Sequence, residues 1–191
     1  MRVLGVDPGL TRCGLAVIDA LPGRRVTLVD FGAATSPADE TVDRRLLAIA
    51  EAIGQWLERH RPDAVAVERV FAQRNAYTVA GTMQASGVAM VEAARRGIEV
   101  GLHTPTEVKA AVTGNGDAPK EQVARMVTRV LGLAEPPRPA DAADALALAI
   151  CHAWRPATLS ATGGAAATPA QKAWVEAARA ARRRRKTWVA A

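Results

Sequence analysis

The stretch that decides the fold reads RVLGVDPGLTRCG (residues 2–14). An apolar run typical of a β-strand opens it, and a second such run starts at its last residue and ends at Ala20. The Pro8-Gly9 step between the two runs is typical of a sharp turn, so we expect the runs to pair as a hairpin. Asp7 stands where the first run ends, which puts a carboxylate at the edge of the predicted sheet.

Strands and helices alternate after this hairpin. A third strand follows a Pro-Gly turn, and the apolar residues then change to helical spacing. The expected elements are a strand at 26–35, a helix over 46–57, a strand at 64–67 that ends in Glu68, a helix at 76–96, a strand at 98–103, and helices at 105–112, 120–131 and 140–154. This order predicts an α/β fold of ribonuclease-H-like architecture, a mixed five-stranded sheet flanked by helices.

Length and composition place the chain among globular proteins. Its 191 residues suffice for one domain and a tail, and 49% of them are hydrophobic and 23% charged. No stretch reaches the roughly 18 uncharged apolar residues that a membrane span requires. Cys13 and Cys151 lack the spacing of a metal site or of a disulfide framework, so we expect a reducing, cytoplasmic location and no membrane partner.

The net charge of +6 is concentrated at the end of the chain. Residues 157–191 contain seven basic residues and one acidic residue, whereas the first 156 residues carry equal numbers of each. We expect one folded domain at 1–155, followed by a linker and basic tail at 156–191. The tail is either a solvated extension or a nonspecific attractor of phosphate, and the sequence favours neither.

Four carboxylates stand where chemistry is expected. Asp7 and Glu68 each end an apolar strand, and they converge if those strands are parallel neighbours. Asp141 and Asp144 are three residues apart, so they share one face of a helix. Acids gathered in this way repel one another unless cations neutralise them, and carboxylate oxygens suit Mg²⁺ or Mn²⁺. Structural alternatives remain for single members, because Asp7 is also a usual turn residue and Asp141 a usual helix cap.

Three motifs together resemble the RuvC family of bacterial Holliday-junction resolvases. They are Asp-Pro-Gly-Leu-Thr-Arg-Cys-Gly at 7–14, Glu-Arg-Val-Phe at 68–71 and Asp-Ala-Ala-Asp-Ala-Leu-Ala at 141–147. The resemblance covers residues 1–155, so this segment is expected to be the nuclease domain. The specificity lies in the order and context of the three motifs, because an Asp-Pro-Gly turn alone also occurs in other ribonuclease-H-like proteins.

The resemblance implies a metal-dependent endodeoxyribonuclease that acts on four-way junction DNA in recombination and repair. A homodimer would cut strands of like polarity in two symmetric nicks. In each subunit Asp7, Glu68, Asp141 and Asp144 would hold two Mg²⁺ ions, with Mn²⁺ as a substitute. Members of the family work with a RuvA–RuvB branch-migration complex, and the sequence leaves open whether this chain does.

Further candidates for the site surround these acids. The resemblance places Lys109 and Lys120 near the scissile phosphate, where they would offset charge on the phosphoryl oxygens. Phe71 is expected either to stack on unpaired bases at the junction centre or to pack in the core. The expected DNA-binding residues are Phe71, Arg69, Arg74 and Asn75.

Two other classes of function stay open beside the resolvase. One is a junction-binding protein without catalysis, against which the complete set of four acids argues. The other is an actin-like ATPase or a different ribonuclease-H-like enzyme, and the absence of a second nucleotide-binding half argues against the ATPase. The helix at 76–96 has few charges, which favours its use as a subunit interface.

Overall fold

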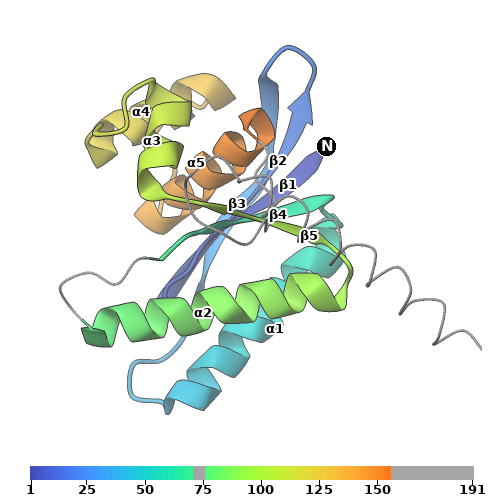
Figure 1. The fold of residues 1–191 in the computed structure, drawn as a ribbon, viewed down its shortest axis with the longest axis vertical. Helices are drawn as coiled ribbons and strands as arrows, with labels where there is room; N and C mark the ends of the chain where they lie inside the picture. The colour runs from blue at the N-terminus through green and yellow to red at the C-terminus, as the bar shows by residue number, and fades with distance from the viewer. Residues whose placement is uncertain (71–75, 156–191) are drawn as a thin grey trace, which may run out of the picture. The chain divides into compact units, whose positions relative to one another are not determined.

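The computed structural model describes residues 1–70 and 76–155. Strands and helices follow one another there in the expected order (Figure 1). The strands are β1 (Arg2–Asp7), β2 (Arg12–Leu21), β3 (Arg25–Thr35), β4 (Ala64–Glu68) and β5 (Glu99–His103). The helices are α1 (Val42–His60), α2 (Ala76–Arg95), α3 (Pro105–Thr113), α4 (Lys120–Leu131) and α5 (Ala140–Trp154).

The five strands form one mixed sheet in the order β3-β2-β1-β4-β5. β1 and β2 pair antiparallel, as do β2 and β3, whereas β1, β4 and β5 run parallel. The hairpin expected from the Pro8-Gly9 step is therefore confirmed, and its ladder reaches as far as Asp7 opposite Gly14. β2 begins two residues earlier than the sequence predicts, because Arg12 pairs with Thr35 of β3.

Helices cover both faces of the sheet, α1 and α2 on one side and α3, α4 and α5 on the other (Figure 1). Alternate residues of a strand point to opposite faces. Val3 of β1 accordingly packs in the cluster with α5, while its neighbour Leu4 packs in the cluster with α1 and α2. Both side chains are fully buried, and each such burial stabilises the fold by about 1.5–3 kcal/mol. The described segments contain no helix long and apolar enough to cross a membrane.

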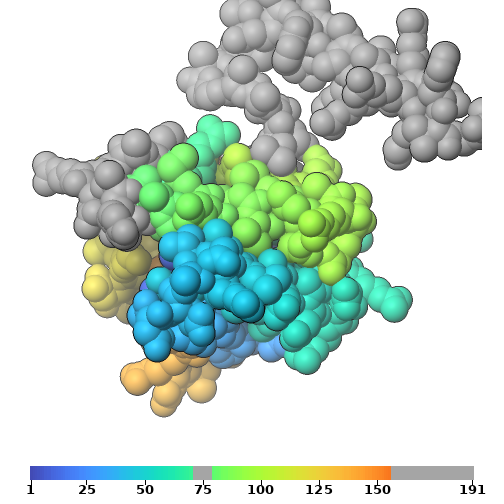
Figure 2. Space-filling model, turned by 90° about the horizontal axis from the view of Figure 1, so that it is seen from below, coloured from blue at the N-terminus to red at the C-terminus, as the bar shows by residue number. Residues whose placement is uncertain are grey.

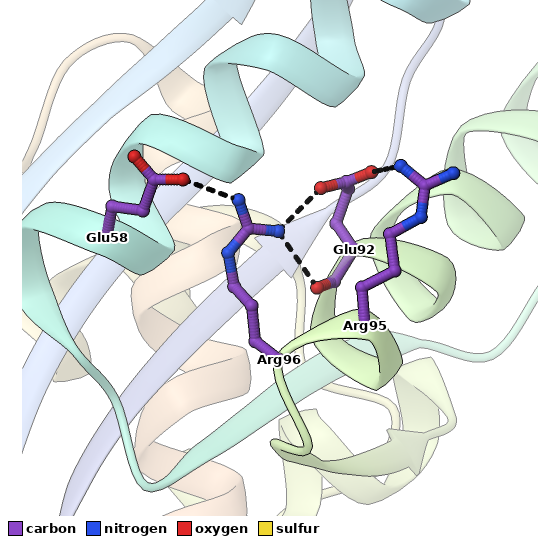
Figure 3. A network of polar contacts seen from close by, with 4 residues as sticks. All are labelled: Glu58, Glu92, Arg95 and Arg96. Carbon is purple, nitrogen blue, oxygen red and sulfur yellow. Dashed lines mark hydrogen bonds and ion pairs between the residues drawn. The ribbon is translucent and has the colours of Figure 1, made fainter.

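α1 and α2 lie side by side on their face of the sheet (Figure 2) and are joined by a charged network (Figure 3). Arg96, just after α2, bonds to Glu92 of α2 at 2.6 Å and to Glu58 of α1 at 2.8 Å. Arg95 also bonds to Glu92, at 3.0 Å. Glu92 is only 8% exposed, so the two guanidinium groups supply the partners that a buried carboxylate requires. This network fixes the end of α2 against α1.

Candidate active site

Two of the four expected acids end neighbouring parallel strands. Val6 of β1 pairs with Val67 of β4, so Asp7 and Glu68 follow one step later at the same sheet edge. Gly5 and Ala66, two residues before the acids, lie on the α5 side of the sheet. The alternation of a strand therefore directs both carboxylates to that side. The convergence expected from the sequence is confirmed.

The start of α5 brings Asp141 and Asp144 to the same place. Asp141 is the second residue of α5 and Pro139 is its N-cap residue, so Asp141 does not cap the helix. The helix lies close to the sheet, because a Cβ added at Gly14 would overlap the backbone oxygen of Asp141. A Cβ at Gly5 would overlap the backbone oxygen of Ala145 in the same way. Both glycines are thus required for the approach of the helix.

The acids are close enough for their charges to help raise the pKa values of Asp7 and Glu68. Burial, followed by the negative charges of Glu68, Asp144 and Asp141 in that order of strength, raises the pKa of Asp7 to about 7. Burial, followed by the charge of Asp144, also raises the pKa of Glu68. Such raised pKa values mark a site whose charge is only partly compensated by the protein.

Two cations compensate part of this charge. Lys120 Nζ donates to Asp144 Oδ2 at 2.9 Å, and this hydrogen bond raises the pKa of Lys120. Arg12 Nη1 donates to Asp141 Oδ2 at 3.3 Å. The sequence predicts Lys120 as a site residue, whereas the contact of Arg12 was missed. No local pattern of the sequence predicts this contact, which depends on the close approach of α5 to β2 that Gly14 allows.

Lys109 and Lys120 both line the wall of one cavity. The cavity has a volume of about 280 Å³ and is also lined by Glu68 and Asp144, so it opens on the acids. α3 carries Lys109, and a capping box starts that helix: Glu107 N donates to Thr104 Oγ1, while Thr104 N donates to the Glu107 carboxylate. The two expected lysines therefore reach one hollow from different helices.

A buried histidine pair supports the neighbouring strand. His103 ends β5 opposite Glu68, and its Nε2 lies 3.0 Å from Nδ1 of His152 in α5. Both side chains are buried, at 2% and 4% exposed, and burial lowers the pKa of His103 to about 4. Neutral rings therefore link β5 to α5 behind the acids.

One of the four residues expected to bind DNA, Arg69, lies within the described part of the chain. Arg69 is half-buried, and its backbone N–H donates to the His103 carbonyl at 2.7 Å, which fixes the chain just after β4. Phe71, Arg74 and Asn75 lie outside the described residues.

The donor set fits a hard divalent cation. As the side chains stand, no three His, Cys, Asp or Glu residues within 1–70 and 76–155 are arranged to hold a metal ion together. Asp141 and Asp144 are each turned to a cation instead. Four carboxylates remain the oxygen ligands that such ions prefer, and the raised pKa of Asp7 shows a repulsion that a cation would relieve.

The fold and this acidic sheet edge define a nuclease of the ribonuclease-H-like class. Residues 3–152 match the family model described as "Crossover junction endodeoxyribonuclease RuvC". The chain belongs to the RuvC family, which shows that it is a hydrolase of DNA with the metal dependence of that family.

Curated relatives and solved structures agree with this assignment. A crossover junction endodeoxyribonuclease RuvC of Paenarthrobacter aurescens is 59% identical over 187 residues, which cover 97% of this chain and 99% of the relative. One of Streptomyces avermitilis is 64% identical over 155 residues, or 81% of this chain and 88% of the relative. The structure of T. thermophilus RuvC in complex with a Holliday junction substrate superposes with a TM-score of 0.77 at 38% identity, covering 81% of this chain and 93% of that one.

Proposed function

We propose that this protein resolves Holliday junctions by hydrolysing phosphodiester bonds at the sheet edge formed by β1, β4 and α5. The observation that carries the proposal is the convergence of four carboxylates at one partly buried place, where burial and the charges of the other three acids raise the pKa of Asp7 to about 7. The solved complex of T. thermophilus RuvC with a junction supports the choice of substrate.

Asp7, Glu68, Asp141 and Asp144 would hold two Mg²⁺ ions, for which Mn²⁺ can substitute. Two such ions, when bound, activate a water molecule and stabilise the leaving oxygen of a phosphodiester. The acids of this chain would orient the ions, and the raised pKa of Asp7 predicts that the site fills more readily once Asp7 is ionised.

Lys109 and Lys120 would act on the phosphate. Lys120 is already placed beside the acids by Asp144, and Lys109 shares the same cavity. Their positive charges would lie near the phosphoryl oxygens on which charge develops, and fixed charge of this kind stabilises a transition state without later reorganisation. Arg69, Phe71, Arg74 and Asn75, which follow β4 directly, would contact the DNA that leads to this phosphate.

Two subunits would act together. The exposed side of α2 carries Met83 and Val91, which are 53% and 50% exposed, and a Cβ added at Gly87 would meet no atom within 4 Å. Large apolar side chains around an open glycine favour close contact with a second copy of the chain. A homodimer with twofold symmetry would present two acid sites to a junction of near-twofold symmetry and would make paired nicks in strands of like polarity.

The remaining assignments follow from the family. Residues 1–155 would form the nuclease domain, and residues 156–191, which lie outside the described part, a linker and basic tail. A RuvA–RuvB branch-migration complex would be the protein partner. A DNA substrate and two free buried thiols, Cys13 and Cys151, fit a cytoplasmic location.

The test compares Glu68→Gln with Glu99→Gln. Glu99 starts β5 at the opposite edge of the sheet and is exposed, so the second variant makes the same change away from the acids. With Mg²⁺ and a synthetic four-way junction, Glu68→Gln should bind the junction without cutting it, and Glu99→Gln should cut like the wild type. A wild type that binds junctions but never cuts them would favour a silent binding protein. Normal cutting by Glu68→Gln would refute the assignment of the acids.

A further inference from the structure

Arg12 is held above the start of α5 by an ordered turn. Ser36 of the segment after β3 donates its N–H to the Thr11 carbonyl at 3.2 Å, and its hydroxyl donates to the Leu10 carbonyl. Arg45 of α1 donates to Thr11 Oγ1 at 2.7 Å. These bonds fix the backbone on both sides of the turn, so the position of the Arg12 Cα is set by the fold.

The side chain of Arg12, by contrast, is weakly attached. Within residues 1–70 and 76–155 its side chain makes one hydrogen bond, 3.3 Å long, to Asp141, and the two side chains are 54% and 31% exposed. A single contact between partly exposed charges is weak and is screened by salt. The contact is therefore easily exchanged for another.

Arg12 and a divalent cation cannot both use Asp141 without cost. The carboxylate of Asp141 is one of the charges that raise the pKa of Asp7, and Arg12 neutralises part of it. A cation bound by the same carboxylate would stand within a few ångströms of the guanidinium group, and like charges at that distance repel.

A second place for the side chain lies next to the turn. A cavity of about 620 Å³ is lined by Arg12 itself, by Leu10, by Arg45 of α1 and by Gly81 of α2. Arg12 already borders this hollow, so open space lies beside its side chain when it leaves Asp141.

We infer that Arg12 is an exchangeable counter-ion of Asp141, which competes with the divalent cation for this carboxylate and turns away when the cation binds. The inference rests on the proposed function, since it takes Asp141 as a metal ligand. Arg12 thus acts through Asp141. In the metal-free protein it neutralises part of the acids' charge, so the site binds metal less tightly than the carboxylates alone would.

The test measures Mn²⁺ binding to the full-length protein without DNA, by paramagnetic resonance of the free ion, at pH 8, where Asp7 is ionised. Arg12→Gln should bind Mn²⁺ about two- to fivefold more tightly than the wild type, as expected for the loss of one exposed ion pair. Arg12→Lys keeps the charge and should stay near the wild-type affinity. Arg25→Gln removes the same charge from the far end of the β2–β3 hairpin and should change nothing.

Asp7→Asn separates the possible failures. If Asp7→Asn binds Mn²⁺ as tightly as the wild type, the proposed metal site is wrong and the inference about Arg12 falls with it. If Asp7→Asn loses binding but Arg12→Gln equals the wild type, only the inference about Arg12 is overturned. It is also overturned if Arg12→Lys or Arg25→Gln tightens binding as much as Arg12→Gln, because the effect would then not come from one charge at Asp141.

Discussion

Asp7→Asn is expected to stabilise the metal-free protein while it abolishes cleavage. The Asp7 carboxylate is costly in the folded state, because burial and the three other acids disfavour its charge. An asparagine has nearly the same size and carries no charge, so the variant escapes this cost. It also loses one of the proposed metal ligands, which is why stability and activity should move in opposite directions.

The magnitude follows from the pKa of Asp7, which is about 7 in the folded protein against an ordinary value of 3.8. Below pH 3.8 the group is protonated in both states and costs nothing. As the pH rises to 7, the unfolded chain releases the proton and the folded chain keeps it, so the cost grows. The difference of about 3 pH units, at 1.36 kcal/mol each, sets the full cost above pH 7 at about 4 kcal/mol.

The assay is the free energy of unfolding in urea, without metal, from pH 4 to pH 8. Asp7→Asn should match the wild type near pH 4 and exceed it by a few kcal/mol at pH 8, and only the wild type should be stabilised by added Mg²⁺. Asp19→Asn is the matched control of opposite sign, because the bond to Arg2 lowers the pKa of Asp19. Loss of the Asp19 carboxylate should therefore destabilise the protein at pH values above the ordinary pKa of an aspartate. A constant difference between Asp7→Asn and the wild type at every pH would refute the reasoning.

Three further predictions concern the helix approach, the dimer and the tail. Gly14→Ala should lower the free energy of unfolding by about 1–3 kcal/mol and impair cleavage, because the new methyl group displaces the start of α5. Gly32→Ala is the control, because its methyl group would lie 3.4 Å from a Trp56 ring atom. It should change neither stability nor cleavage in the same denaturation and cleavage assays. Met83→Glu combined with Val91→Glu should yield a folded monomer in sedimentation experiments, and a variant that stays dimeric would exclude α2 as the interface. Removal of residues 157–191 should leave junction cleavage intact and weaken duplex binding at low salt, since it removes a net charge of +6; loss of junction selectivity would show that the tail belongs to the site.

The sequence predicts the sheet and the meeting of Asp7 with Glu68 because both depend on local signals. Alternating and helical spacing identify the elements, and parallel order then places the two strand ends together. The Arg12–Asp141 contact could not be predicted in this way. It joins residues 129 positions apart and depends on how closely α5 lies on the sheet, which no local pattern contains.

The burial of α2 shows a similar limit. Its sparse charge indicates extra apolar surface, but not which side chains supply it. In the structure Val88 packs against the core, whereas Met83 and Val91 are exposed. Helical spacing alone cannot assign these sides, since apolar residues occur around most of the helix.

The central claim, paired cutting of junctions at the acid site, is tested most directly by mapping the cuts. Each strand of a synthetic four-way junction is labelled in turn and incubated with the full-length protein and Mg²⁺, beside a linear duplex of the same sequence. We predict nicks at symmetric positions in two opposing strands of like polarity, no cuts in the duplex, and no cuts with Asp7→Asn. Cuts in a single strand, or equal cutting of the duplex, would contradict the account.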